Sequence, residues 1–133
     1  MTIEESIEAN ARLVSEHLSA HAGFTLAYDE RSVEWLDGFI ERQRAREDFD
    51  VAANAKLSSM LGCFLGEAMC AEFGGRWQET DHGPGVVFAN GSTAFPLAKV
   101  EKQFVNGADA GDSILGFYRS ARAIGTLEST GDN

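Results

Sequence analysis

Hydrophobic residues recur at helical spacing in the first third of the chain. One apolar stripe consists of Ile3, Ile7, Val14 and Leu18. This spacing predicts a helix over residues 2–21, which Thr2 and Glu5 begin as a capping box and Gly23 ends. A second apolar stripe consists of Trp35, Leu36, Phe39 and Ile40. It predicts a second helix over residues 32–46, and Asp48 and Asp50 follow as caps for a third.

The third predicted helix, residues 51–73, carries two different apolar faces. The bulky face consists of Leu57, Leu61, Phe64 and Leu65, with Ala68 and Ala71. The opposite side consists of the small residues Ala52, Ala55, Ser59, Gly62, Cys63, Gly66 and Cys70. A helix that is apolar all round is buried, and small residues let another backbone approach closely. We therefore expect this helix to lie at the centre of the fold and to end at Gly74-Gly75.

After residue 75 the hydrophobic period changes from helical to two, which predicts strands over residues 76–80, 86–89 and 92–95. The residues at 81–85 favour a turn. Asn90-Gly91 indicates a hairpin with a two-residue loop. That register pairs Phe88 with Thr93 and Val86 with Phe95, so that Val86, Phe88 and Phe95 share one face.

Two further helices complete the pattern. Pro96 is suited to the first position of a fourth helix, which ends at Asn106-Gly107. Asp112 or Ser113 caps a fifth helix that ends at Gly125. Residues 126–133 show no core pattern, which predicts a disordered tail. The sequence thus predicts a single α+β domain over residues 1–125: two N-terminal helices, a long central helix, a small three-stranded antiparallel sheet and two C-terminal helices.

Size and charge restrict the function. The chain has 133 residues, enough for one ordinary domain, and a formal net charge of −10. Twelve of the 21 acidic and five of the 11 basic residues lie in residues 1–50, so this segment has a net charge of −7. Nucleic acids and anionic membranes bind basic surfaces, so neither is expected as a partner, whereas a basic protein is.

The sequence favours a cytoplasmic protein. No apolar run has the length of a membrane span, and the first residues are acidic where a secretion signal is basic. The two cysteines, Cys63 and Cys70, are about 10 Å apart along one straight helix, too far to form a disulfide. They fit a reducing compartment.

Three stretches carry a family resemblance: WLDGFIERQR at 35–44, LGCFLGEAMCAEFGGRW at 61–77, and FPLAKVEKQFVNG at 95–107 followed by DSILGFYR at 112–119. Over about residues 30–122 the chain resembles a family of small bacterial proteins that is defined as a domain of unknown function. These stretches are mostly helix faces, caps and turns. The resemblance therefore implies a fold and no catalytic residue.

Glu67 is the strongest candidate for chemistry. Apart from the cysteines it is the only ionisable residue between Lys56 and Glu72. A buried carboxyl marks some active sites, although a glutamate at a helix edge or in an ion pair fits the pattern as well. Lys99 lies in the first turn of a helix, where the dipole disfavours a cation. These positions suggest a polar site formed by Glu67, Arg76, Lys99 and Tyr118, unless Lys99 is simply exposed.

Other candidate chemistry is weaker. His17 and His21 have metal-binding spacing but lack a third ligand, and His82 in its turn lacks a nucleophile. Phosphate-binding, dinucleotide-binding and nucleophile-elbow motifs are absent, so no cofactor or metal is expected. Trp35 and Trp77 are interpreted as core anchors.

Two functions are consistent with these features. The favoured one is a non-catalytic, acidic protein-interaction module, such as an adaptor, a chaperone-like or an immunity-like protein. The alternative is a small-molecule-binding protein or small enzyme that uses the polar site around Glu67 and Lys99. A filled core around Glu67 favours the first function, and a pocket there favours the second. The oligomeric state, the partner and the substrate do not follow from the sequence.

Overall fold

The structure is a computed structural model that describes the backbone of residues 1–131 and the side chains of residues 1–124. Over these residues it has five α-helices, two short 3₁₀ helices and one sheet. The α-helices are α1 (Ile3–Ala22), α2 (Glu30–Arg44), α3 (Ala55–Phe73), α4 (Pro96–Asn106) and α5 (Ile114–Gly131), and the 3₁₀ helices are η1 (Ala52–Asn54) and η2 (Ala108–Ala110). The strands are β1 (Arg76–Thr80), β2 (Gly83–Val87) and β3 (Thr93–Ala94). The predicted α+β class and order of elements are confirmed.

Capping side chains begin the first two helices. Thr2 and Glu5 form the predicted capping box, and Gly23 ends α1 in the left-handed conformation. The second helix begins earlier than predicted, at Glu30, because the carboxylate of Asp29 accepts a hydrogen bond from Ser32 N at 2.9 Å. It also ends two residues earlier than predicted, at Arg44.

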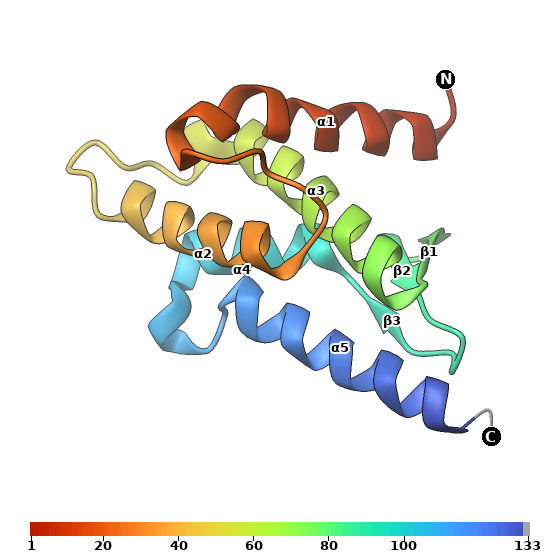
Figure 1. Cartoon of the computed structure of the whole chain (residues 1–133). Coiled ribbons are helices and arrows are strands. Elements are labelled where there is room, and N and C mark those ends of the chain that lie inside the picture. Colours follow the sequence, from red (N-terminus) through yellow and green to blue (C-terminus); the bar gives the residue numbers. More distant parts are fainter. Residues whose placement is uncertain (132–133) are drawn as a thin grey trace.

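The central helix α3 lies between α1 on one side and α5 on the other (Figure 1). Its predicted first residues form η1, where Asp50 accepts a hydrogen bond from Ala52 N at 3.1 Å. From Leu61 to Met69 every residue except Glu67 is buried, on the bulky and the small side alike. The predicted burial of both faces is therefore confirmed for this part of the helix.

Two glycines of α3 allow close packing. A Cβ atom at Gly62 would lie 2.7 Å from the Cα atom of Leu97 in α4. A Cβ atom at Gly66 would lie 2.0 Å from Cζ2 of Trp77 in β1. Both distances are far below van der Waals contact, so α4 and the first strand approach α3 this closely only because these positions lack side chains.

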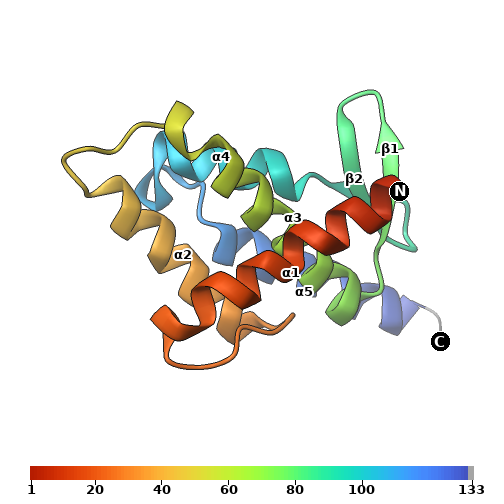
Figure 2. The same cartoon turned by 90° about the horizontal axis from the view of Figure 1, so that it is seen from above.

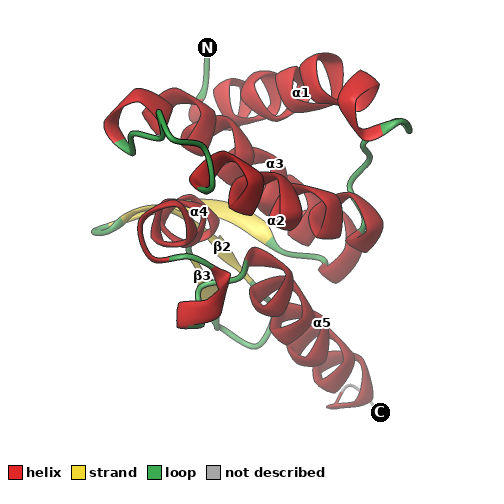
Figure 3. Ribbon diagram, turned by 90° about the vertical axis from the view of Figure 1, so that its left-hand side faces the viewer, coloured by secondary structure: helices red, strands yellow, loops and turns green. Residues whose placement is uncertain are grey.

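The sheet has the order β1-β2-β3, and both pairs are antiparallel. The β1–β2 hairpin stands at the end of the molecule where α1 begins (Figure 2). The sheet packs against α3 and α4, while α5 packs directly on α2 and α3. Figure 3 shows the sheet and these helices from the side. The expected turn over residues 81–85 is shorter, since β2 already begins at Gly83.

The register of the second hairpin differs from the prediction by one residue. Val86 lies opposite Ala94 rather than Phe95, and Val87 lies opposite Thr93. Phe95 is therefore not the cross-strand partner of Val86, and this predicted pair is wrong. Val86 and Phe88 remain buried in the core, as predicted.

The cause of the shift is the loop. Gly91 N donates to Phe88 O at 2.9 Å, and Phe88 N donates to Ser92 O at 2.9 Å, so the loop has three residues. Only Gly91 among them has a positive φ, of 89°. Asn90 thus does not adopt the left-handed conformation that a two-residue loop requires, and the alternative with a glycine bulge forms instead.

The C-terminal helices begin and connect largely as predicted. Pro96 is the first residue of α4, Gly107 ends that helix, and Ser113 Oγ accepts a hydrogen bond from Gly116 N at 3.2 Å at the start of α5. The fifth helix, however, continues past Gly125 to Gly131. One glycine costs a helix only about 1 kcal/mol relative to alanine, so it does not end a helix by itself. Of the predicted tail, residues 132–133 lie outside the described residues.

None of the helices over residues 1–131 combines the length and apolar character needed to cross a membrane.

Candidate functional site

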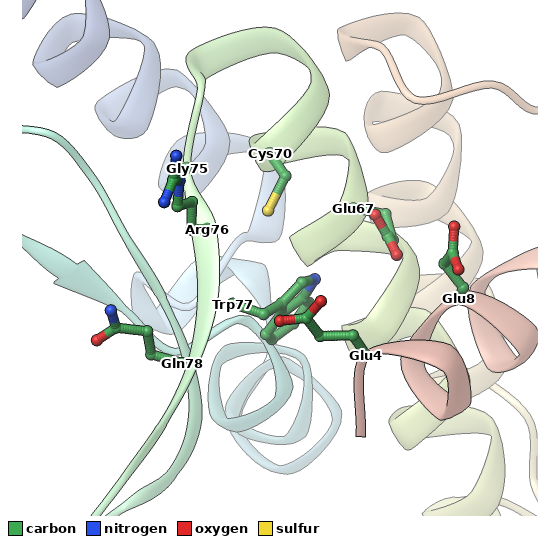
Figure 4. A pocket seen from close by; sticks show the side chains of 8 residues that line it. All are labelled: Glu4, Glu8, Glu67, Cys70, Gly75, Arg76, Trp77 and Gln78. Atoms are coloured by element: carbon green, nitrogen blue, oxygen red, sulfur yellow. The ribbon is translucent and has the colours of Figure 1, made fainter. Parts of the chain in front are cut away.

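A pocket of about 580 Å³ lies where α1, α3 and β1 meet. Its lining consists of Glu4, Glu8, Glu67, Cys70, Gly75, Arg76, Trp77 and Gln78. Figure 4 shows these residues from close by, with the carboxylates on the side of α1 and α3 and the strand opposite them. We call this feature the carboxylate pocket.

Three carboxylates from two helices face this pocket. Glu4 and Glu8 are one helical turn apart on α1, and Glu67 lies on the adjacent turn of α3 (Figure 4). Among the described side chains, no lysine, arginine or histidine lies within ion-pair distance of any of the three. The pocket therefore concentrates negative charge, and Arg76, the cationic side chain in its lining, forms no ion pair with these carboxylates.

The pKa of Glu67 responds to this environment. Burial raises the pKa of its carboxyl first, because removal from water disfavours the charged form, and the negative charges of Glu8 and Glu4 raise it further. A positive charge placed in the pocket would act in the opposite direction. The site is thus electrostatically suited to a cation.

Trp77 is both a wall of the pocket and a support of the fold. Its ring packs against Gly66 and its indole Nε1 atom is buried without a hydrogen-bond partner. In Figure 4 the nitrogen is on the side of the indole that faces the carboxylates. A buried N–H group is rarely left without an acceptor, so this donor is an unsatisfied polar group enclosed in the wall of the pocket.

The thiol of Cys70 lines the same pocket but is not activated. Burial, followed by the charges of Glu67 and Glu4, raises the pKa of Cys70 to about 12. Burial and Glu67 raise the pKa of the nearby Cys63 to about 11. Because the thiolate is the nucleophile, both thiols are poorly suited to covalent catalysis at neutral pH. Both cysteines are free.

The structure brings together only two of the four residues of the predicted polar site. Glu67 and Arg76 line the carboxylate pocket, but the guanidinium of Arg76 points away from the three carboxylates (Figure 4). Lys99 lies elsewhere, in a pocket of about 340 Å³ at β3, α4 and α5. Its Nζ atom lies 3.0 Å from Asp112 Oδ1 and 3.3 Å from Gly111 O. Lys99 thus holds the loop before α5 and does not face Glu67.

Tyr118 is also separate from Glu67. It is fully buried, its hydroxyl donates a short hydrogen bond to the carboxylate of Glu72, and its ring lies 4.8 Å from that of Phe73. Burial, and then Glu72, raise the pKa of the phenol far above its usual value. Tyr118 therefore joins α5 to α3 as a neutral hydrogen-bond donor.

Sequence reasoning missed Glu4, Glu8 and Trp77 as members of the site. A signal for the first two exists, since glutamates four residues apart on one helix share a face. No local signal places that face against β1. Trp77 packs on α3, as its predicted role of core anchor requires, but it is only partly buried.

The described residues contain no group of three or more histidine, cysteine, aspartate or glutamate side chains arranged to hold a metal ion. The three carboxylates therefore form a negatively charged lining and are not arranged as the ligands of a metal ion.

Fold and site together define a small α+β protein with an acidic surface pocket. Comparison of the chain with protein-family models, with curated proteins and with solved structures finds no match. The resemblance to the bacterial family of unknown function remains a prediction.

Proposed function

We propose that this protein is a non-catalytic interaction module that binds a basic partner through the carboxylate pocket. The observation that carries the proposal is the group of Glu4, Glu8 and Glu67, three carboxylates in one pocket that form no ion pair with any described side chain, including Arg76 in the same lining. A lysine or arginine of a partner would relieve this repulsion and form charge-assisted hydrogen bonds.

Two further observations support binding rather than catalysis. The thiol beside Glu67 stays protonated at neutral pH, because the pKa of Cys70 is raised to about 12. The net charge of −10 attracts basic molecules at long range and speeds their encounter with the pocket. The alternative function around Glu67 and Lys99 lacks a shared cavity, since the two residues line different pockets.

The test is the binding of a fluorescein-labelled octapeptide of alternating threonine and arginine, followed by fluorescence anisotropy. We expect binding that weakens as salt rises from about 0.05 M to about 0.5 M, because salt screens charge interactions. Glu67→Gln should raise the Kd about tenfold, as expected for the loss of one charge-assisted hydrogen bond.

The matched control is Glu47→Gln, which removes the same charge from an exposed position outside the pocket. It should change the Kd less than twofold. A peptide with glutamate in place of arginine should not bind. Equal effects of the two substitutions, or no binding of the arginine peptide, would contradict the proposal.

A further inference from the structure

The carboxylate pocket lies beside a free sheet edge. In the order β1-β2-β3, the strand β1 pairs with β2 alone, and no other strand in residues 1–131 pairs with it. An unpaired edge presents backbone N–H and C=O groups to which another strand can bind. Many proteins recognise a peptide at such an edge, where the peptide binds as an added strand and extends the sheet.

The register shows which backbone groups of β1 face outward. Phe88 N donates to Ser92 O, so the even-numbered residues of β2 direct their backbone groups towards β3. The odd-numbered ones, such as Gly85, therefore face β1. Gly85 lies opposite Gln78. By alternation, Trp77 and Glu79 direct their N–H and C=O groups away from β2, towards the free edge.

This edge and the carboxylates belong to the same pocket. Gly75 and the strand residues Arg76–Gln78 line it on one side, and Glu4 and Glu8 of α1 and Glu67 of α3 line it on the other. The indole Nε1 of Trp77 is a buried donor without a partner in this lining. A molecule in the pocket thus meets backbone hydrogen-bonding groups on one side and negative charge on the other.

We propose that the occupant of the pocket is an extended basic segment of a partner protein, which pairs with β1 as an added strand. The inference rests on the proposed function and specifies the form of its partner. Side chains alternate between the two faces of a strand, so every second residue of the segment faces the carboxylates. These residues are arginine or lysine, placed between Glu4, Glu8 and Glu67 and against the indole of Trp77.

The protein-side test compares Glu79→Pro with Glu79→Ala. Both substitutions remove the same charge, but only proline removes the outward N–H group of this edge residue. Proline is tolerated where the N–H group does not bond within the sheet. We expect the Thr-Arg octapeptide to bind about tenfold more weakly to Glu79→Pro than to Glu79→Ala, the effect of one lost hydrogen bond.

A second measurement uses the wild-type protein and therefore does not depend on the folding of a variant. Two octapeptides are compared, one N-methylated at every arginine and one at every threonine. In an added strand, alternate residues direct their N–H groups to β1, so one of the two peptides loses binding and the other retains it. The amide of Glu79 should also exchange more slowly with solvent when the unmodified peptide is bound.

The outcomes separate this inference from the proposed function. Loss of binding in Glu67→Gln, combined with equal binding of the two N-methylated peptides and of the two Glu79 variants, overturns strand pairing alone. If the arginine peptide does not bind at all, both proposals fail. Concentration-dependent dimerisation of the free protein that Glu79→Pro abolishes would assign the edge to a second copy of the chain, and would overturn the inference.

Discussion

Glu67 is half-buried on α3 and faces the carboxylates of Glu4 and Glu8, and burial and these two charges raise its pKa. The unfolded chain lacks this environment, so it releases the same proton at a lower pH. As pH rises through and above the ordinary range of a glutamate, ionisation of Glu67 is therefore less favourable in the folded state. The folded protein loses stability over that range and does not regain it at neutral pH.

We expect Glu67→Gln to increase the free energy of unfolding at about pH 7, and to change it much less at about pH 4. The gain should not exceed about 1 kcal/mol, because solvent screens a half-buried charge. Urea denaturation at both pH values measures it. Glu47→Gln, at an exposed position, should show no such difference. A free energy of unfolding that is unchanged or lower at pH 7 would refute the role given to burial and charge.

Tyr118 has a structural role, in contrast to its predicted place in a polar site. Tyr118→Phe removes the hydroxyl that donates to Glu72 and keeps the ring contact with Phe73. A hydrogen bond to a charged group contributes about 1.5–3 kcal/mol, so the unfolding free energy should fall by about that amount. Binding of the Thr-Arg octapeptide should not change. A variant of unchanged stability that binds the peptide more weakly would contradict the structural role and would show that Tyr118 belongs to the binding site.

Among the elements, the small residues of α3 lie where α4 and β1 pack closely against this helix. The small face receives α4 at Gly62 and β1 at Gly66, so a helix that carries almost no charge is enclosed on both sides. Close packing of this kind leaves no space for added atoms. The glycines therefore act through the space they leave, although glycine lowers the intrinsic stability of a helix.

Gly66→Ala should lower the free energy of unfolding by about 1–3 kcal/mol, because the added methyl group overlaps the ring of Trp77 and forces it to move. The same substitution at Gly116 in α5 is the control, since a Cβ atom there meets nothing closer than 3.9 Å. Gly116→Ala should stabilise the protein by about 0.5–1 kcal/mol through helix propensity. Thermal and urea denaturation compare the two. Equal effects would contradict the packing argument.

The hairpin between β2 and β3 shows a limit of local signals. Asn90-Gly91 does produce a turn, as predicted. The choice between a two-residue and a three-residue loop depends on the conformation of one asparagine, and it decides which residues oppose each other in the sheet. Val86 and Phe88 are buried with either loop, so the burial pattern alone does not distinguish the two.

At the scale of the whole molecule, a buried hydrogen-bond network joins segments that are distant in sequence. Gln103 of α4 is fully buried, and its Nε2 atom lies 3.2 Å from Asp37 O and 3.0 Å from Glu41 Oε2. Its Oε1 atom accepts from Ile114 N at 2.8 Å. One amide thus connects α2, α4 and the start of α5. This arrangement satisfies a helix N-terminus that would otherwise be buried without a partner.

Gln103→Leu should therefore lower the free energy of unfolding by about 2–3 kcal/mol, because Ile114 N loses its acceptor in a buried setting and Glu41 loses one of its donors. Lys102→Ala, at the exposed neighbouring position, should change it by less than about 0.5 kcal/mol. Urea denaturation followed by tryptophan fluorescence measures both. A loss no larger than that of the control would show that the network adds little to stability.

The sequence by itself determined the elements and most of their ends, because these depend on neighbouring residues. The capping box at Thr2, the left-handed ends at Gly23 and Gly74, and Pro96 at the start of α4 all act within a few residues. The sequence also located the central helix, because a helix that is buried on all its faces has apolar or small residues on every face.

Only the tertiary structure decided which charged residues meet. The sequence predicts that Glu67 and Lys99 share a polar site, yet Lys99 pairs with Asp112 and Glu67 faces Glu4 and Glu8. Exposed and half-buried side chains at helix edges carry no periodic signal of their neighbours. Their environment depends on how α1 crosses α3. It also depends on the position of β1, which lies close to α3 because the ring of Trp77 packs against Gly66. Contacts between distant segments therefore created the carboxylate pocket, and local patterns do not encode them.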